Sequence, residues 1–306
     1  AATYHTSFPE YVENYTRDIS LEALTWKYMI LFYHAVDEVV VPSKFIARLL
    51  HERGLRNRKL LILDRWVDTE RFHPGHRDDT FWSQRGVSPR AVKFLYVGRV
   101  GLEKNLDVMA AAFEQLLATH PDAHLVVVGD GPYRQALQQR LAGSPCTFTG
   151  FLEGDELSRA FASADVKLFP STTDTWGNAP LEAQASGLPV VVSDKGGPHE
   201  LMIDGVTGIK VRGRDVDALL AAMRTLMNGT LRTEMGRAAR RFVEENRIDE
   251  PFSAILESEA YRQRVKRKKK VALLEQEAAE VEPVEPDFVE THLVDHRVHT
   301  TWAAGA

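Results

Sequence analysis

The sequence contains little cysteine and no long apolar run. Its one cysteine, Cys146, excludes an internal disulfide and any zinc site built from several cysteines. No segment approaches the roughly 18 apolar residues of a membrane-spanning helix. With 38 Lys and Arg against 43 Asp and Glu, the net charge is −5, which argues against a nucleic-acid-binding protein. The P-loop and Gly-x-Ser-x-Gly signatures are also missing, which excludes P-loop NTPases and serine hydrolases with a nucleophile elbow.

Length and apolar content fit about two domains of about 150 residues each. Apolar residues make up 44% of the 306, enough for a sizeable core. The chain opens with Ala1-Ala2-Thr3-Tyr4-His5, without an initiator Met and without the basic and then apolar stretches of a signal peptide. We expect a cytoplasmic piece of a longer protein, with peripheral contact at the inner membrane face left open.

Short apolar strands alternate with helices between residues 91 and 250. The pattern predicts strands at residues 92–97, 124–128, 147–149, 166–169, 190–193 and 209–211. Apolar strands of this length between helices are typical of a doubly wound α/β fold, a parallel sheet covered on both faces. Ligands of such sheets bind at the carboxyl ends of the strands. The loops after Val97, Val128, Phe169 and Ser193 are therefore the candidate sites.

Residues 1–76 have the pattern of a second, incomplete α/β domain. It contains a short strand at 2–5, a turn at Pro9, an apolar helix at 19–36 and a strand at 38–41. Ser43 is expected to cap the next helix, at 44–53. The helix carries Trp26, Tyr28 and Leu31, which favours burial in a core over contact with a membrane.

The remaining segments are polar. Residues 77–90 are interpreted as an interdomain linker, and a helix is expected over residues 251–268 after Pro251. Residues 262–270 are rich in Lys and Arg, and this basic run leaves open a contact with anionic lipid. We expect the charged tail 269–306 to be disordered, because it can bury little apolar surface.

The loop after the strand at 92–97 carries two cations. Arg99 and Lys104 lie five positions apart in the segment 98–105, which opens a helix. Two cations at the carboxyl end of a strand suit a diphosphate. The alternative is an ordinary surface turn with solvated charges.

A second candidate loop follows Phe169. Asn178 is interpreted as the cap of the next helix, and Pro180 suits its first turn. Gly177 allows a close approach to a ligand, and the free amides at the helix start form an anion site. Asp174 and Glu182 flank that site, so one could hold a ribose and the other a hexose. The alternative is a capped core helix with an incidental acid.

Two further motifs carry weaker signals. His5 lies at the carboxyl end of the first predicted strand, where a structural role is the alternative. Gly129-x-Gly131 is followed by Arg134 where a dinucleotide fingerprint has its third glycine, which weakens the interpretation as a nicotinamide-dependent dehydrogenase.

At these motifs the sequence resembles the family-4 retaining glycosyltransferases of the GT-B fold. The nearest branch contains GDP-mannose-dependent α-mannosyltransferases and sulfoquinovosyl transferases. The matching stretches are residues 4–11, 67–74, 97–105, 128–132 and 174–189. The family's Glu-x7-Glu motif falls on Asp174 and Glu182, with Asp in place of the first Glu.

The resemblance implies two Rossmann-like domains, with nearly half of the N-terminal one lying before Ala1. His5, Arg99, Lys104 and Asp174 are implied as catalytic residues. The implied donor-binding residues are Gly98, Arg99, Lys104, Gly129, Gly131, Asp174, Gly177, Asn178, Ala179 and Glu182. No cofactor and no metal is implied.

The expected function is transfer of a hexose of the mannose or glucose type from a GDP- or UDP-linked sugar to a lipid or saccharide acceptor, with retention. The alternative is a nucleotide-sugar-binding module or an inactive remnant without a full acceptor lobe. A glycosidase pair formed by Asp174 and Glu182 is disfavoured by the adjacent anion site.

Overall fold

A computed structural model describes residues 1–56, 59–63, 66–246 and 266. All of these except Lys266 lie in one compact unit, Ala1–Arg262. The predicted helix at 251–268, the basic run at 262–270 and the tail at 269–306 therefore fall outside the described residues, apart from Lys266. Within the described segments, no helix combines the length and the apolar character that crossing a bilayer requires.

The larger of the two sheets in the described chain has six parallel strands in the order β6-β5-β4-β7-β8-β9. Their bounds are β4 Val92–Val97, β5 Ala123–Val128, β6 Cys146–Gly150, β7 Val166–Phe169, β8 Val190–Ser193 and β9 Gly208–Val211. The prediction of a doubly wound parallel sheet is confirmed. At its centre β4 pairs with β7, with Leu95 opposite Lys167.

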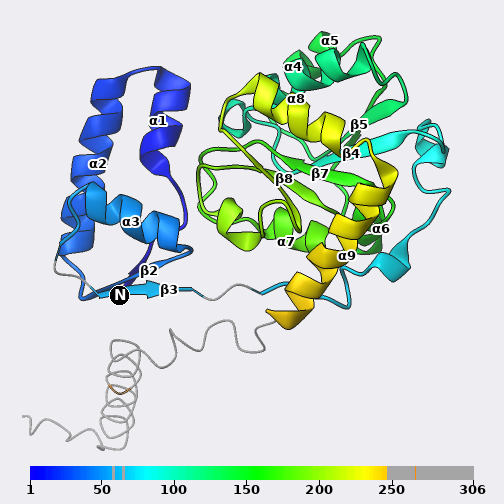
Figure 1. Cartoon of the computed structure of the whole chain (residues 1–306). Coiled ribbons are helices and arrows are strands. Elements are labelled where there is room, and N and C mark those ends of the chain that lie inside the picture. Colours follow the sequence, from blue (N-terminus) through cyan, green and yellow to red (C-terminus); the bar gives the residue numbers. More distant parts are fainter. Residues whose placement is uncertain (57–58, 64–65, 247–265, 267–306) are drawn as a thin grey trace, which may run out of the picture. The chain divides into compact units, whose positions relative to one another are not determined.

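Helices cover both faces of this sheet (Figure 1). On one face, α4 (Leu106–Leu117), α5 (Arg134–Arg140) and α8 (Val216–Thr225) pack on the even-numbered side chains of β4, such as Phe94. On the other, α6 (Gly154–Ala162) and α7 (Asn178–Ala185) pack with Leu95, and α9 (Gly229–Glu245) contributes to both cores. The alternating side chains of each strand thus separate two apolar cores.

The smaller sheet has the order β1-β2-β3, with β1 Ala2–Thr3, β2 Glu38–Val41 and β3 Lys59–Ile62. Helix α3 (Lys44–Glu52) follows β2, and the Ser43 side chain accepts from the Ile46 amide, which confirms its predicted cap. The predicted turn at Pro9 is wrong. Residues Phe8–Thr16 form helix α1, and Pro9 is tolerated because it lies in the first turn.

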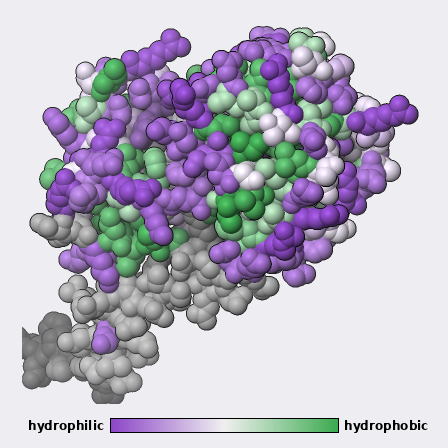
Figure 2. All heavy atoms as spheres, in the orientation of Figure 1, coloured by the Kyte–Doolittle hydropathy of each residue, from purple (hydrophilic) through white to green (hydrophobic). Residues whose placement is uncertain are grey.

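Helix α2 (Ile19–His34) is apolar on two opposite sides. Trp26, Met29 and Tyr33 are buried, as expected of a core helix, whereas Tyr28 and Leu31 are each 70% exposed. Leu21, Leu24 and Phe32 are exposed as well. The helix therefore has an apolar face that no described residue covers, and Figure 2 shows hydrophobic residues at the surface among hydrophilic ones.

Residues 77–90, interpreted from the sequence as a linker, pack on the larger sheet. Phe81, Trp82 and Val87 are almost completely buried in the core that contains Leu95 and Phe161. Because most residues of the segment are polar, its sequence does not indicate that Phe81, Trp82 and Val87 are buried.

Candidate active site

The carboxyl ends of β4 and β7 form the centre of the candidate site. From β4 the chain continues outward through β5 and β6, and from β7 it continues in the opposite direction through β8 and β9. The connections after β4 and β7 therefore diverge at a topological switch point, where open α/β sheets bind their ligands. We call residues 98–105 the β4 loop and residues 170–177 the β7 loop.

Lys104 joins the two loops. Its Nζ donates to both carboxylate oxygens of Asp174, at 2.7 and 3.0 Å. Burial lowers the pKa of Lys104, but the charge of Asp174 and the hydrogen bond to it, with smaller contributions from Tyr11 and Glu103, together raise the pKa above its usual value. Next to this pair, the side-chain amide of Asn105 (Nδ2) donates to the Pro170 carbonyl and to Thr172 Oγ1. These contacts hold two loops that are 70 residues apart in the sequence in one structure.

Arg99 is the more exposed of the two cations. Its side chain is 55% exposed, and its Nε lies 4.0 Å from Oε1 of the completely buried Glu103. Glu103 also accepts from the Tyr15 hydroxyl of α1 at 2.8 Å. No local pattern in the sequence indicates the Tyr15–Glu103 contact, because the two residues are 88 positions apart. The guanidinium of Arg99 remains accessible for an anion above the β4 loop.

Glycines let the β4 loop lie against the turn after β5. A Cβ on Gly129 would lie 2.0 Å from the Gly98 carbonyl oxygen, and one on Gly131 would lie 2.4 Å from that of Val100. The Val100 amide donates to the Asp130 carbonyl, which fastens the same contact. In this structure Gly129 and Gly131 therefore allow the turn after β5 to pack directly against the backbone of the β4 loop.

The start of α7 differs in detail from the prediction. Asn178 was expected as the cap, but the cap position is Gly177, and no side chain caps the helix. The helix therefore begins at Asn178, one residue earlier than predicted. Asn178 and Ala179 occupy its first positions, and Pro180 is still in the first turn. The first amides of a helix have no partner within it, so they remain available to an anion.

Glu182 lies on α7 beside a residue that the sequence analysis missed. Burial raises the pKa of Glu182, while the positive charges of Lys167 and Arg71 lower it. Lys167 of β7 has no exposed surface. A lysine within the otherwise apolar strand Val166–Phe169 was the signal that could have found it.

His5 lies two residues after β1, close to the β7 loop. Its carbonyl oxygen accepts from Thr175 Oγ1 at 2.7 Å, and its side chain is exposed. The structure thus places His5 next to the loop that carries Asp174. Among the described residues there is no cluster of three or more His, Cys, Asp or Glu arranged to hold a metal ion.

Two cavities lie near α7 and the β7 loop, but one of them alone is lined by residues of that loop. This cavity, of about 330 Å³, is lined by Thr172 and Thr173 of the β7 loop, Lys195 and Gly196 after β8, and Ser7 beside His5, among others. The Gly196 turn is fixed here because the Gly197 amide donates to the Asp174 carbonyl.

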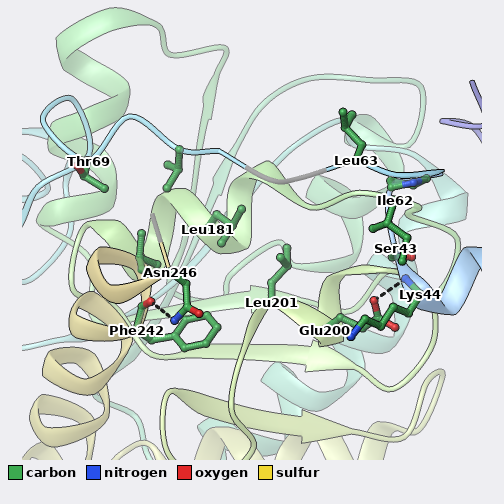
Figure 3. A pocket seen from close by; sticks show the side chains of 13 residues that line it. Ser43, Lys44, Ile62, Leu63, Thr69, Leu181, Glu200, Leu201, Phe242 and Asn246 are labelled. Carbon is green, nitrogen blue, oxygen red and sulfur yellow. Dashed lines mark hydrogen bonds between the residues drawn. The ribbon is translucent and has the colours of Figure 1, made fainter. Parts of the chain in front are cut away.

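The other cavity, of about 410 Å³, is drawn in Figure 3. Its lining includes Leu63, Leu181, Leu201 and Phe242, and at one end Glu200 accepts from the Lys44 amide at 2.9 Å. This cavity contains none of the predicted donor-binding residues.

Two family models match the chain. Residues 91–229 match the model described as glycosyl transferases group 1, and residues 1–71 match the model described as glycosyltransferase family 4. Both models describe glycosyltransferases.

Curated proteins of the same class match the chain, and solved structures share its fold. The chain is 34% identical to a sulfoquinovosyl transferase from Arabidopsis thaliana, over 79% of this chain and 48% of that protein. It is 30% identical to a GDP-mannose-dependent alpha-mannosyltransferase from Corynebacterium glutamicum, over 78% and 55% of the two chains. Sucrose-phosphate synthase from Thermosynechococcus elongatus has the same fold, with a TM-score of 0.71, 23% identity and coverage of 87% and 67%.

An Anabaena protein, HepE, in complex with UDP and glucose also has this fold. Its TM-score is 0.67 at 17% identity, and the match covers 81% of this chain and 67% of HepE. The chain spans about half the length of the curated relatives it matches.

Proposed function

Because this chain belongs to the group 1 glycosyltransferases of family 4, we propose that it carries the donor site of a retaining hexosyltransferase. The donor is a GDP- or UDP-linked sugar of the mannose or glucose type, and the acceptor is a lipid or a saccharide. The single observation that supports this most is the Lys104–Asp174 contact at the switch point, which brings a cation, a carboxylate and the start of α7 to one sheet edge.

The chemistry follows from the charge that develops in the reaction. When the bond between sugar and diphosphate breaks, negative charge builds on the departing phosphate oxygens. Arg99, Lys104 and the first amides of α7 are positive groups already in place to stabilise that charge, so no reorganisation is needed at that moment. Asp174 addresses the sugar and Glu182 the ribose, while His5 lies on the acceptor side. No step requires a covalent nucleophile or a metal ion.

We expect the purified protein to release UDP or GDP from one nucleotide sugar of a panel when an acceptor lipid or saccharide is supplied. The measurement is nucleotide release for UDP-glucose, UDP-sulfoquinovose and GDP-mannose, each with and without acceptor. NAD is the control ligand, because a dehydrogenase would bind it instead.

Tight binding of one donor without turnover would support the alternative, a nucleotide-sugar-binding module. Absence of binding by every donor, in a protein shown to be folded by circular dichroism, would contradict the proposed function.

The apolar face of α2 supports a further part of the proposal, peripheral contact with a membrane. It presents Leu21, Leu24, Tyr28, Leu31 and Phe32 together, and burying such side chains in the acyl boundary is favourable. We expect Leu24→Glu with Leu31→Glu to reduce co-flotation with anionic lipid vesicles at least about tenfold, since a buried charge in lipid is costly.

A matched control for this experiment is Leu102→Glu, an exposed leucine of the β4 loop that lies outside α2. Its flotation should equal that of the unmodified protein. Equal flotation of the α2 double variant would instead exclude α2 as the contact.

A further inference from the structure

Lys167 is a completely buried lysine at the switch point. Its Nζ donates to the Val97 carbonyl at 3.3 Å, and Val97 directly precedes Gly98 of the β4 loop. The same Nζ lies 5.0 Å from the ring centre of Tyr96 and 5.6 Å from that of Phe169. The ammonium group is therefore under the edge where β4 and β7 end.

This position is costly for a charge. In the part of the chain that the structure describes, no carboxylate lies within ion-pair distance of Lys167, and burial lowers its pKa to about 7. The unfolded chain keeps a pKa of about 10.5. Because the unfolded state then binds more protons, stability rises with pH between these two values and is lowest below pH 7. A group that destabilises the fold and lies at a ligand-binding edge is a candidate functional residue.

The groups that face Lys167 come from every element packed around it. Glu182 from α7 and Asp174 from the β7 loop favour its charged form. Asp174 is already bonded to Lys104. From β4 it meets the Tyr96 ring and the Val97 carbonyl, and its register partner on β8, Val190, carries no charge.

We propose that Lys167 is a positioning residue for the donor, whose ammonium orients Glu182 and adds buried positive charge below the diphosphate, so that donor binding draws a proton onto it. This inference rests on the proposed function. An anion placed above the switch point stabilises the charged amine, and the field acts strongly because few water molecules screen it. If Lys167 had only a structural role, as a neutral amine that donates to the Val97 carbonyl, donor binding would not transfer a proton to it.

The sign of the pH effect follows. Below pH 7 the amine is already charged, so the donor binds with full affinity. Above pH 7 the free protein must first take up a proton at Lys167 before the donor binds with full affinity. The observed affinity therefore falls as the pH rises from 7 to the higher pKa that Lys167 has in the complex. We expect a loss of about fivefold in donor affinity between pH 6.5 and 8.5, and uptake of about half a proton at pH 7.5.

The experiment is calorimetric titration of the protein with the nucleotide sugar that it binds, at pH 7.5 in two buffers of different ionisation enthalpy. A nucleotide sugar is preferred to UDP or GDP because its diphosphate does not titrate near neutral pH. Lys167→Met is expected to bind without proton uptake and with nearly constant affinity over this pH range. In this variant KM should rise more than kcat falls, because the buried charge below the diphosphate and the orientation of Glu182 are lost.

Lys93→Met is the matched control. Lys93 is a buried lysine on β4, bonded to Asp165 at 2.9 Å at the opposite end of the sheet. The Lys93→Met variant should take up as many protons on donor binding as the unmodified protein.

Each outcome has one meaning. Donor binding without proton uptake by the unmodified protein overturns the inference and leaves the proposed function standing, even if Lys167→Met does not fold. Unchanged uptake in Lys167→Met also overturns it. Absence of donor binding by the unmodified protein overturns both.

Discussion

Replacement of both Arg99 and Lys104 by alanine is expected to weaken UDP or GDP binding by at least about 100-fold. A hydrogen bond to a charged group contributes about 1.5–3 kcal/mol, and the double variant removes two such donors. It also leaves the Asp174 carboxylate, now without Lys104, facing the diphosphate. Because the lost charge acts on the leaving group, turnover should fall at least as far as affinity. Calorimetric titration with both nucleotides measures the effect.

The matched control replaces Arg224 and Arg237 by alanine. Both are exposed cations on helices of the same domain, so the net charge changes equally while the switch point remains intact. Nucleotide affinity should then stay within about twofold, since exposed charges are screened by salt. Unchanged affinity in the Arg99 and Lys104 variant would refute their assignment to the diphosphate.

Gly129→Ala is expected to lower the free energy of unfolding by about 3 kcal/mol or more. Gly129 has φ +124°, where an L side chain is strained, and its new Cβ would lie 2.0 Å from the Gly98 carbonyl oxygen. The obstacle is backbone, so the β4 loop itself must move. Donor affinity should fall along with stability, because that loop carries Arg99 and Lys104. Urea unfolding and nucleotide titration on the same variant test both effects.

Gly143→Ala is the control that separates the cost of a positive φ from the cost of a steric clash with the Gly98 backbone. Gly143 also has a positive φ, +83°, but a Cβ there meets nothing within 4 Å. It should cost only about 1–2 kcal/mol and leave nucleotide binding unchanged. Equal losses for the two variants would mean that the contact with Gly98 has no role in holding the loop.

The larger sheet could be predicted from the sequence because its strands are short apolar runs between helices. The β4 and β7 strands match their predicted bounds, and both candidate loops lie at one edge, as the strand–helix alternation requires. Local signals also located the Ser43 cap. Helix α1 differs from the predicted turn at Pro9 because proline, which favours turns, is also compatible with a first helical turn.

The rest depends on long-range contacts that no local pattern encodes. The Tyr15–Glu103 and Lys104–Asp174 contacts join residues 88 and 70 positions apart. At the start of α7 the cap position is occupied by Gly177 and not by Asn178, although asparagine has the higher propensity for a cap, so local propensity does not locate this helix start. The burial of Phe81 and Trp82 was hidden by the polar residues around them.

The account depends most on one claim, that the β4 loop and the start of α7 hold a diphosphate between them. A crystal structure of the protein with UDP or GDP tests it directly. We predict phosphate oxygens within hydrogen-bond distance of Arg99, Lys104 and the amides of Asn178 and Ala179, with the ribose at Glu182. A nucleotide bound elsewhere, with the Lys104–Asp174 pair unchanged and no phosphate at α7, would contradict the account.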